Sequence, residues 1–141
     1  MNYNQLKLIN QLCFPLYACS RQLVKKYKPY LNEIGLTYTQ YIVLLVLWET
    51  SPITVKALGD MLYLDSGTLT PLLKRLEADG IITRARSKDD ERNLVVTLTK
   101  KGEEIKHQAK DIPYKIKSCI NLSDEDHKTF YRIINNVLKE I

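Results

Sequence analysis

Residues 54–99 constrain the fold of this chain more than any other segment, because helix and strand signals follow one another there without a linker. A threonine cap precedes the helical pattern of residues 55–62, and Asp65 or Ser66 can cap a second helix that stops at Gly80. Two short helices joined by a tight turn predict a helix-turn-helix.

A hairpin pattern follows the second helix directly. Residues 81–86 and 93–98 are rich in β-branched and apolar side chains, and the polar stretch 87–92 between them is typical of a hairpin loop. The sequence therefore predicts a mainly α-helical chain with a small β-hairpin wing, in which residues 37–99 form a winged helix-turn-helix.

Prolines interrupt the helical pattern at the start of the chain. From Leu6 onward, apolar residues recur at helical spacing. Pro15 predicts a kink or a restart of the helix beside Cys13, and the helix is expected to end before Pro29.

Polar caps predict where three further helices begin. These helices are expected over residues 38–49, over residues 100–117 and from residue 124 onward, after the caps Thr37, Thr99 and Ser123. Pro113 is expected to bend or divide the second of them.

The amphipathic helices at both ends of the chain carry apolar faces, although a winged-helix core requires only the middle of the chain. These faces must therefore be buried elsewhere. Residues 1–36 and 100–141 are therefore interpreted as the dimerisation region of a single domain that spans residues 1–141. A two-fold dimer would present two recognition helices to successive major grooves of a pseudo-palindromic duplex, about 34 Å apart.

Composition narrows the class of protein. The 141 residues, 45% hydrophobic and 26% charged, are typical of one globular domain, and the net charge of +5 favours a polyanionic partner or merely solubility. No apolar run approaches the roughly 20 residues that cross a bilayer, and the N-terminus does not resemble a signal peptide, so a cytoplasmic protein without a membrane partner is expected.

Cysteine and glycine patterns exclude most catalytic classes. Three cysteines without CxxC spacing and two histidines far from any cysteine pair indicate free thiols, with no metal site and no cofactor. Neither a GxxxxGK phosphate loop nor a GxSxG nucleophile elbow is present in the sequence. An enzyme is therefore not expected.

Five segments carry a family resemblance. They are LCFPLYACSR (12–21), YKPYL (27–31), LTYTQY (36–41), LYLDSGTLTPLLKRLE (62–77) and DDERNLVVTLT (89–99). With these segments the chain resembles the MarR-type winged-helix regulators, and among them the OhrR-like sensors of organic hydroperoxides. The resemblance implies a homodimeric, DNA-binding regulator of transcription.

The second helix and the hairpin hold the candidate DNA contacts. On the helix these are Ser66, Gly67, Thr68, Thr70, Lys74 and Arg75, and in the hairpin they are Arg84, Arg86, Lys88, Asp90 and Arg92. Small hydroxylated side chains allow close entry into a groove, although the same residues serve equally well as helix caps beside a solvated face. The resemblance implies that the wing tip enters the minor groove, with Asp90 orienting Arg92 as its salt-bridge partner.

Cys13 is the candidate sensor thiol. A cysteine among apolar neighbours is more often an inert core residue, but the resemblance implies a peroxide-sensing thiolate that accepts hydrogen bonds from Tyr27 and Tyr38, with Tyr17 lining the pocket. The resemblance also implies that the oxidised sulfur is captured either by Cys119 of a partner subunit or by a small thiol.

These expectations combine in one mechanism. The reduced dimer binds operator DNA and represses transcription, and an organic hydroperoxide oxidises Cys13 and releases the dimer. One alternative is a MarR-type repressor that a small phenolic ligand releases without covalent chemistry. A second is a thiol peroxidase that turns over at Cys13, which would leave the helix-turn-helix and the wing unexplained.

Overall fold

Side-chain caps begin five of the helices in residues 3–141, the part of the chain that the computed structural model describes. The capping box at Thr37 is complete: its Oγ1 accepts from the Gln40 amide at 3.3 Å, and Gln40 Oε1 accepts from the Thr37 amide at 2.9 Å. Asp65 rather than Ser66 caps the second helix of the helix-turn-helix, because its Oδ1 accepts from the Thr68 amide at 2.7 Å.

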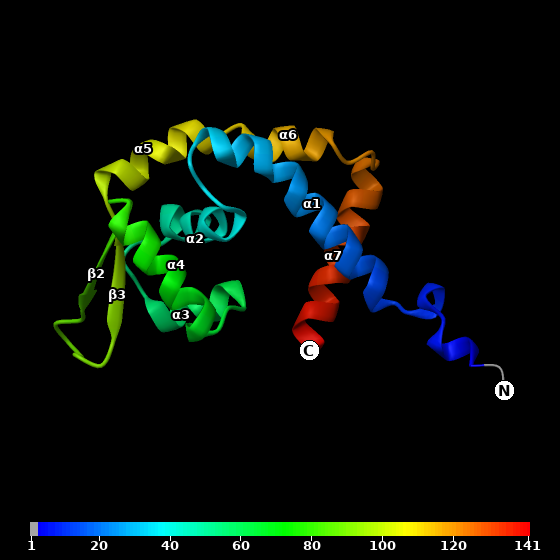
Figure 1. Ribbon diagram of the computed structural model, residues 1–141, viewed down its shortest axis with the longest axis horizontal. Helices are drawn as coiled ribbons and strands as arrows, with labels where there is room; N and C mark the ends of the chain where they lie inside the picture. The colour runs from blue at the N-terminus through cyan, green and yellow to red at the C-terminus, as the bar shows by residue number, and fades with distance from the viewer. Residues whose placement is uncertain (1–2) are drawn as a thin grey trace.

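The elements follow one another in the predicted order. They are the 3-10 turns η1 (Asn4–Leu6) and η2 (Leu8–Asn10), then α1 (Cys13–Glu33), α2 (Tyr38–Glu49), β1 (Ile53–Thr54), α3 (Val55–Leu62), α4 (Ser66–Ala78), β2 (Ile82–Arg86), β3 (Leu94–Leu98), α5 (Lys100–Ala109), α6 (Ile112–Ser118) and α7 (Asp124–Glu140). Figure 1 shows the winged helix, α2 to β3, at one end of the molecule and α1 beside α7 at the other, with η1 and η2 projecting from α1.

The wing is an antiparallel hairpin, as predicted. Strands β2 and β3 pair from Ile82 opposite Leu98 out to Arg86 opposite Leu94, and β1 adds a third strand on the other side of β3. The sequence analysis did not predict β1, because two residues are too few to show an alternating pattern. The fold class, mainly α with a β-hairpin wing, is confirmed.

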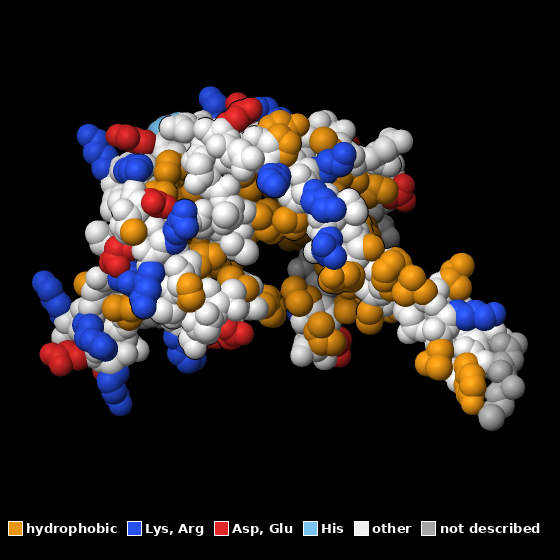
Figure 2. Space-filling view, in the orientation of Figure 1, with side chains coloured by type: hydrophobic (Ala, Val, Ile, Leu, Met, Phe, Trp, Pro, Cys, Tyr) orange, Lys and Arg blue, Asp and Glu red, His pale blue; other side chains and the backbone are white. Residues whose placement is uncertain are grey.

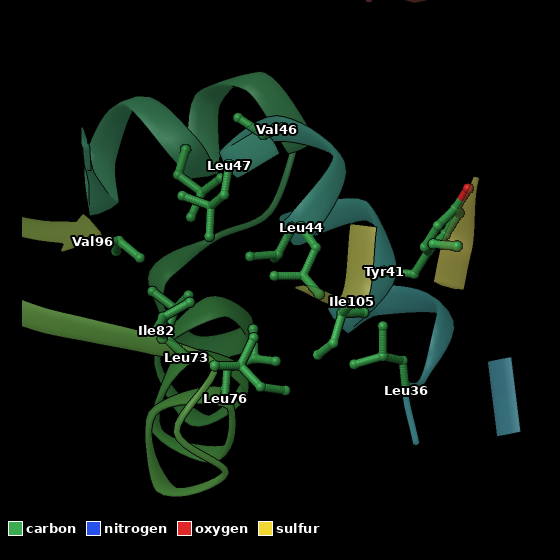
Figure 3. Close-up of a cluster of buried hydrophobic side chains, with 14 of the residues drawn as sticks. Leu36, Tyr41, Leu44, Val46, Leu47, Leu73, Leu76, Ile82, Val96 and Ile105 are labelled. Atoms are coloured by element: carbon green, nitrogen blue, oxygen red, sulfur yellow. The ribbon is translucent and has the colours of Figure 1, made fainter. Parts of the chain in front are cut away.

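The core joins the recognition helix to the wing. Fully buried side chains come from α2, α3, α4 and both wing strands, and Figure 3 shows those of α2, α4 and the wing strands converging. They include Leu44, Leu47, Leu58, Leu69, Leu73, Leu76, Ile82 and Val96. This shared core sets the position of α4 relative to the wing.

Two predictions for the first helix are wrong. The segment from Leu6 forms 3-10 turns rather than a helix. Helix α1 begins at Cys13, which confirms the predicted restart beside that residue, and Pro15 lies in the first turn, where a missing amide hydrogen costs no helical bond. The helix also continues through Pro29 to Glu33, because its end is anchored by Leu31, whose side chain is 1% exposed in the core. Tertiary packing therefore outweighs the one hydrogen bond that Pro29 removes.

The last helices begin where the sequence predicts, but α7 packs no fully buried side chain against the rest of the protein. Pro113 lies in the first turn of α6 and separates it from α5. Helix α7 begins at its Ser123 cap and has no buried residue along its length. Among residues 3–141, no helix has both the length and the apolar character needed to cross a bilayer.

Candidate nucleic-acid interface and thiol site

Helix α4 presents a narrow outer face. Leu69, Leu73 and Leu76 enter the core, so Gly67 and Lys74 point away from it at helical spacing, and both are exposed. Small residues on this face allow the backbone to approach a groove closely, and Lys74 adds a positive charge.

The structure divides the other predicted residues of α4 between two flanks. Ser66 and Thr70 lie on the flank that faces the wing, on the same side as Glu77. Thr68 and Arg75 lie on the opposite flank, where they line a hollow of about 510 Å³ against the turn between α1 and α2. The six predicted contacts therefore spread over the outer face of α4 and both of its flanks.

The wing tip is held by a charged pair. Arg92 donates to both carboxylate oxygens of Asp90, Nε to Oδ1 at 3.0 Å and an Nη to Oδ2 at 3.1 Å, and its amide also donates to Oδ1 at 3.1 Å. These hydrogen bonds lower the pKa of Asp90, so the pair stays charged at neutral pH. The predicted salt bridge is confirmed, and the Arg92 side chain is 90% exposed and points a cation into solvent.

The remaining wing cations differ in their surroundings. Arg86 donates to the Glu91 carbonyl at 2.8 Å across the hairpin, and Lys88 is exposed at the tip. Arg84 instead turns back toward α4 and binds Glu77, a residue that the sequence analysis missed. The sequence could have predicted this ion pair, because Glu77 and Arg84 carry opposite charges at similar distances before and after the turn at Gly80.

Cys13 stands at the first position of α1 and is exposed. In residues 3–141, no hydrogen bond reaches the Cys13 sulfur, and none of the three cysteines forms a disulfide. No cluster of histidine, cysteine or carboxylate side chains in this part of the chain could hold a metal ion.

Tyr27 and Tyr38 meet in an aromatic cluster with Tyr41. The ring centroids of Tyr27 and Tyr38 are 4.9 Å apart, and those of Tyr27 and Tyr41 are 5.8 Å apart. Burial raises the pKa of the Tyr27 and Tyr38 hydroxyls, so both remain protonated hydrogen-bond donors at neutral pH. They line a cavity of about 420 Å³ between α1, α6 and α7.

The structure does not bring Cys13 to these tyrosines within one chain. Cys13 and Tyr27 are separated by 14 positions of the continuous helix α1, which is about 21 Å along the axis. Tyr17 lies one turn after Cys13, and its hydroxyl accepts from Arg21 at 3.0 Å. Cys119 is the residue that follows α6, and its Sγ donates to the Lys115 carbonyl at 3.3 Å.

Comparison with known proteins identifies the family. The family described as "Transcriptional regulator SarA/Rot" matches residues 25–109. The "Organic hydroperoxide resistance transcriptional regulator" of Bacillus subtilis is 48% identical over 139 residues, which cover 99% of this chain and 95% of the relative.

Two solved structures of AbfR from Staphylococcus epidermidis extend the comparison. The reduced, DNA-bound form is 41% identical with a TM-score of 0.78, covering 99% of this chain and 98% of AbfR. The disulfide form is also 41% identical, with a TM-score of 0.63 and coverage of 96% and 92%. The present structure thus matches the reduced, DNA-bound form better than the disulfide form. The chain belongs to the SarA/Rot family of transcriptional regulators and is a MarR-type winged-helix protein of the OhrR-like subgroup.

Proposed function

We propose that the protein is a redox-sensing repressor that binds operator DNA when Cys13 is reduced and leaves it when Cys13 is oxidised by an organic hydroperoxide. The observation that carries the proposal is the near full-length similarity to AbfR, which has been solved both on DNA in its reduced form and as a disulfide. Similarity to the hydroperoxide resistance regulator of Bacillus subtilis supports the class of oxidant. Such a regulator acts in the cytoplasm, on chromosomal DNA.

The proposed DNA interface uses the outer face of α4 and the wing tip. Gly67 and Lys74 enter the major groove, with Ser66 and Thr70 beside them on the flank that faces the wing. Lys88 and Arg92 reach the minor groove or its phosphates. Thr68 and Arg75 contact the adjacent backbone from the opposite flank.

The dimer uses residues 1–36 and 100–141. Apolar side chains of α1, α7 and the turns η1 and η2 remain uncovered, and Figure 2 shows apolar side chains beside the gap between α7 and the winged helix and along the N-terminal turns. Leu16, Phe130, Ile133 and Val137 are each more than 40% exposed. A second copy of the chain covers such surfaces without leaving large apolar areas in water.

The thiol pocket is completed between two chains. Tyr27 lies too far along α1 from the Cys13 of its own chain, so the hydroxyl donors of each Cys13 come from a second copy. The thiolate attacks the outer oxygen of a hydroperoxide ROOH, which leaves a sulfenic acid and an alcohol ROH. The thiol of Cys119 or of a small molecule then displaces water, and a disulfide forms. Loss of the tyrosine contacts moves α1 and changes the spacing of the two recognition helices.

The test is DNA binding at controlled oxidation state. Wild-type protein and the Cys13→Ser variant are titrated onto a promoter duplex with an inverted repeat, before and after cumene hydroperoxide and again after dithiothreitol. We expect wild type to lose at least about a hundredfold in affinity, equivalent to ~3 kcal/mol, and to recover on reduction. Cys13→Ser should bind and ignore the peroxide. A variant that still responds would refute the assignment of Cys13.

The cavity beside Tyr27 and Tyr38 favours a second candidate function. Its volume of about 420 Å³ and its mixture of apolar walls and phenolic hydroxyls suit a small aromatic acid or phenol. In that case such a ligand releases DNA from Cys13→Ser as well as from wild type. Salicylate added in the same titration distinguishes the two functions.

A further inference from the structure

Arg84 is tied into the protein by a fork of hydrogen bonds. Its Nε and one Nη donate to Oε2 of Glu77 at 3.1 and 2.8 Å, and its backbone amide donates to Oε1 at 3.0 Å. The Arg84 side chain is only 15% exposed, whereas that of Arg92 at the tip is 90% exposed. Both carboxylate oxygens of Glu77 are therefore committed to Arg84.

The fork joins the two elements that are proposed to read DNA. Glu77 lies in the last turn of α4, and Arg84 is the central residue of β2, opposite Val96 of β3. The chain between them reverses at Gly80, whose φ of 73° is left-handed. The fork thus lies across the base of the wing and restrains its angle to α4.

We infer that Arg84 and Glu77 form a positioning pair that holds the wing at the angle needed for DNA binding, and that Arg84 is not a phosphate ligand. The inference rests on the proposed function only where DNA binding is the quantity measured. From Ile82 to Arg86 the wing strand is five residues long, or about 17 Å. A tilt of about 10° at its base moves the tip by about 3 Å, the length of one hydrogen bond.

Two conservative variants separate a positioning pair from a phosphate contact. Glu77→Gln keeps the shape of the side chain but removes its negative charge and one of the two acceptor oxygens, while Arg84→Lys keeps the positive charge but cannot form the fork. A phosphate ligand would tolerate Arg84→Lys and would bind DNA at least as well after Glu77→Gln. The positioning pair predicts that each variant weakens binding, by about tenfold.

The DNA experiment uses a duplex of about 30 base pairs that the wild-type dimer selects from a randomised pool, long enough for two half-sites. The double variant should bind no more weakly than either single variant, because both remove one interaction. Arg86→Met, a neighbour in the same strand without the fork, should instead add its effect to that of Glu77→Gln. Additive losses for Glu77→Gln and Arg84→Lys, or unchanged binding by Glu77→Gln, would overturn the inference.

A second measurement needs no DNA. Amide hydrogen exchange of residues 82–98 should become faster in both variants, while the thermal midpoint and dimer size confirm that they fold. If exchange in the wing is unchanged, the positioning role is wrong even where DNA binding is lost. If exchange rises but wild type selects no duplex, the pair stands and the proposed function fails.

Discussion

Replacing Gly102 with alanine should destabilise the protein although it improves the helix propensity of α5. A Cβ atom at this position would lie 2.5 Å from the Ile81 carbonyl oxygen and 2.6 Å from Cδ1 of Leu98. The Ile81 carbonyl cannot move freely, because it accepts from the Thr99 amide at 3.1 Å and from the Thr99 hydroxyl at 2.9 Å. Helix α5 must therefore shift away from the base of the wing.

Three contributions determine how Gly102→Ala changes the free energy of unfolding. Alanine gains about 1 kcal/mol over glycine inside a helix, whereas overpacking against a fixed backbone costs about 3 kcal/mol. The shift also breaks the bond from Trp48 Nε1 to the Gly102 carbonyl, at 3.0 Å, which is worth about 1 kcal/mol. The net loss is about 3 kcal/mol, and the thermal midpoint should fall by roughly 10 °C at fixed protein concentration.

The assay is thermal and urea unfolding followed by the fluorescence of Trp48, the single tryptophan of the sequence. Its indole lies at the broken hydrogen bond, so the folded-state emission should also change. Gly67→Ala is the control, since its Cβ would meet only Asp65 Oδ1, at 3.3 Å, and its stability should stay within about 0.5 kcal/mol of wild type. A Gly102→Ala protein that melts at or above the wild-type temperature would refute the packing argument.

Three further predictions concern the core and the wing. Burial raises the pKa of Tyr41 from 10.0 to about 12, so the folded state keeps a proton that the unfolded state loses. Stability should fall as pH rises from about 10 to about 12, and Tyr41→Phe should reduce this fall by on the order of 2 kcal/mol in urea titrations. Leu44→Ala, at a side chain with no exposure, should lower the free energy of unfolding by about 2–5 kcal/mol. A smaller loss would show that neighbouring side chains move in to fill the cavity. Arg92→Ala should weaken binding to all duplexes alike and lower the salt slope by about 1, and an unchanged slope would remove it from the phosphate contacts.

Local signals in the sequence predicted most of the elements. The caps at Thr37, Thr54, Thr99 and Ser123 each accept the expected backbone hydrogen bond, and Gly80 adopts the left-handed conformation at the end of α4. Such signals act within one helical turn, so they can be read without knowing the rest of the fold. The same holds for the Asp90 and Arg92 pair, which is formed within the hairpin loop.

The errors arose where distant packing opposed a local rule. Leu31 is buried against the core and holds α1 together beyond Pro29, a residue that would end an isolated helix. At Pro29 the surrounding contacts outweigh the intrinsic preference of one residue.

The sequence by itself determined the kind of protein: a winged helix with a cationic hairpin, a thiol near the N-terminus and amphipathic ends. The tertiary structure alone decided how those residues are grouped. It separated Arg84 from the other wing cations by binding it to Glu77, and it packed Thr68 and Arg75 of α4 against the turn between α1 and α2. Motifs and caps depend on short stretches of chain, whereas the partner of a side chain depends on how whole elements pack, which no single segment encodes.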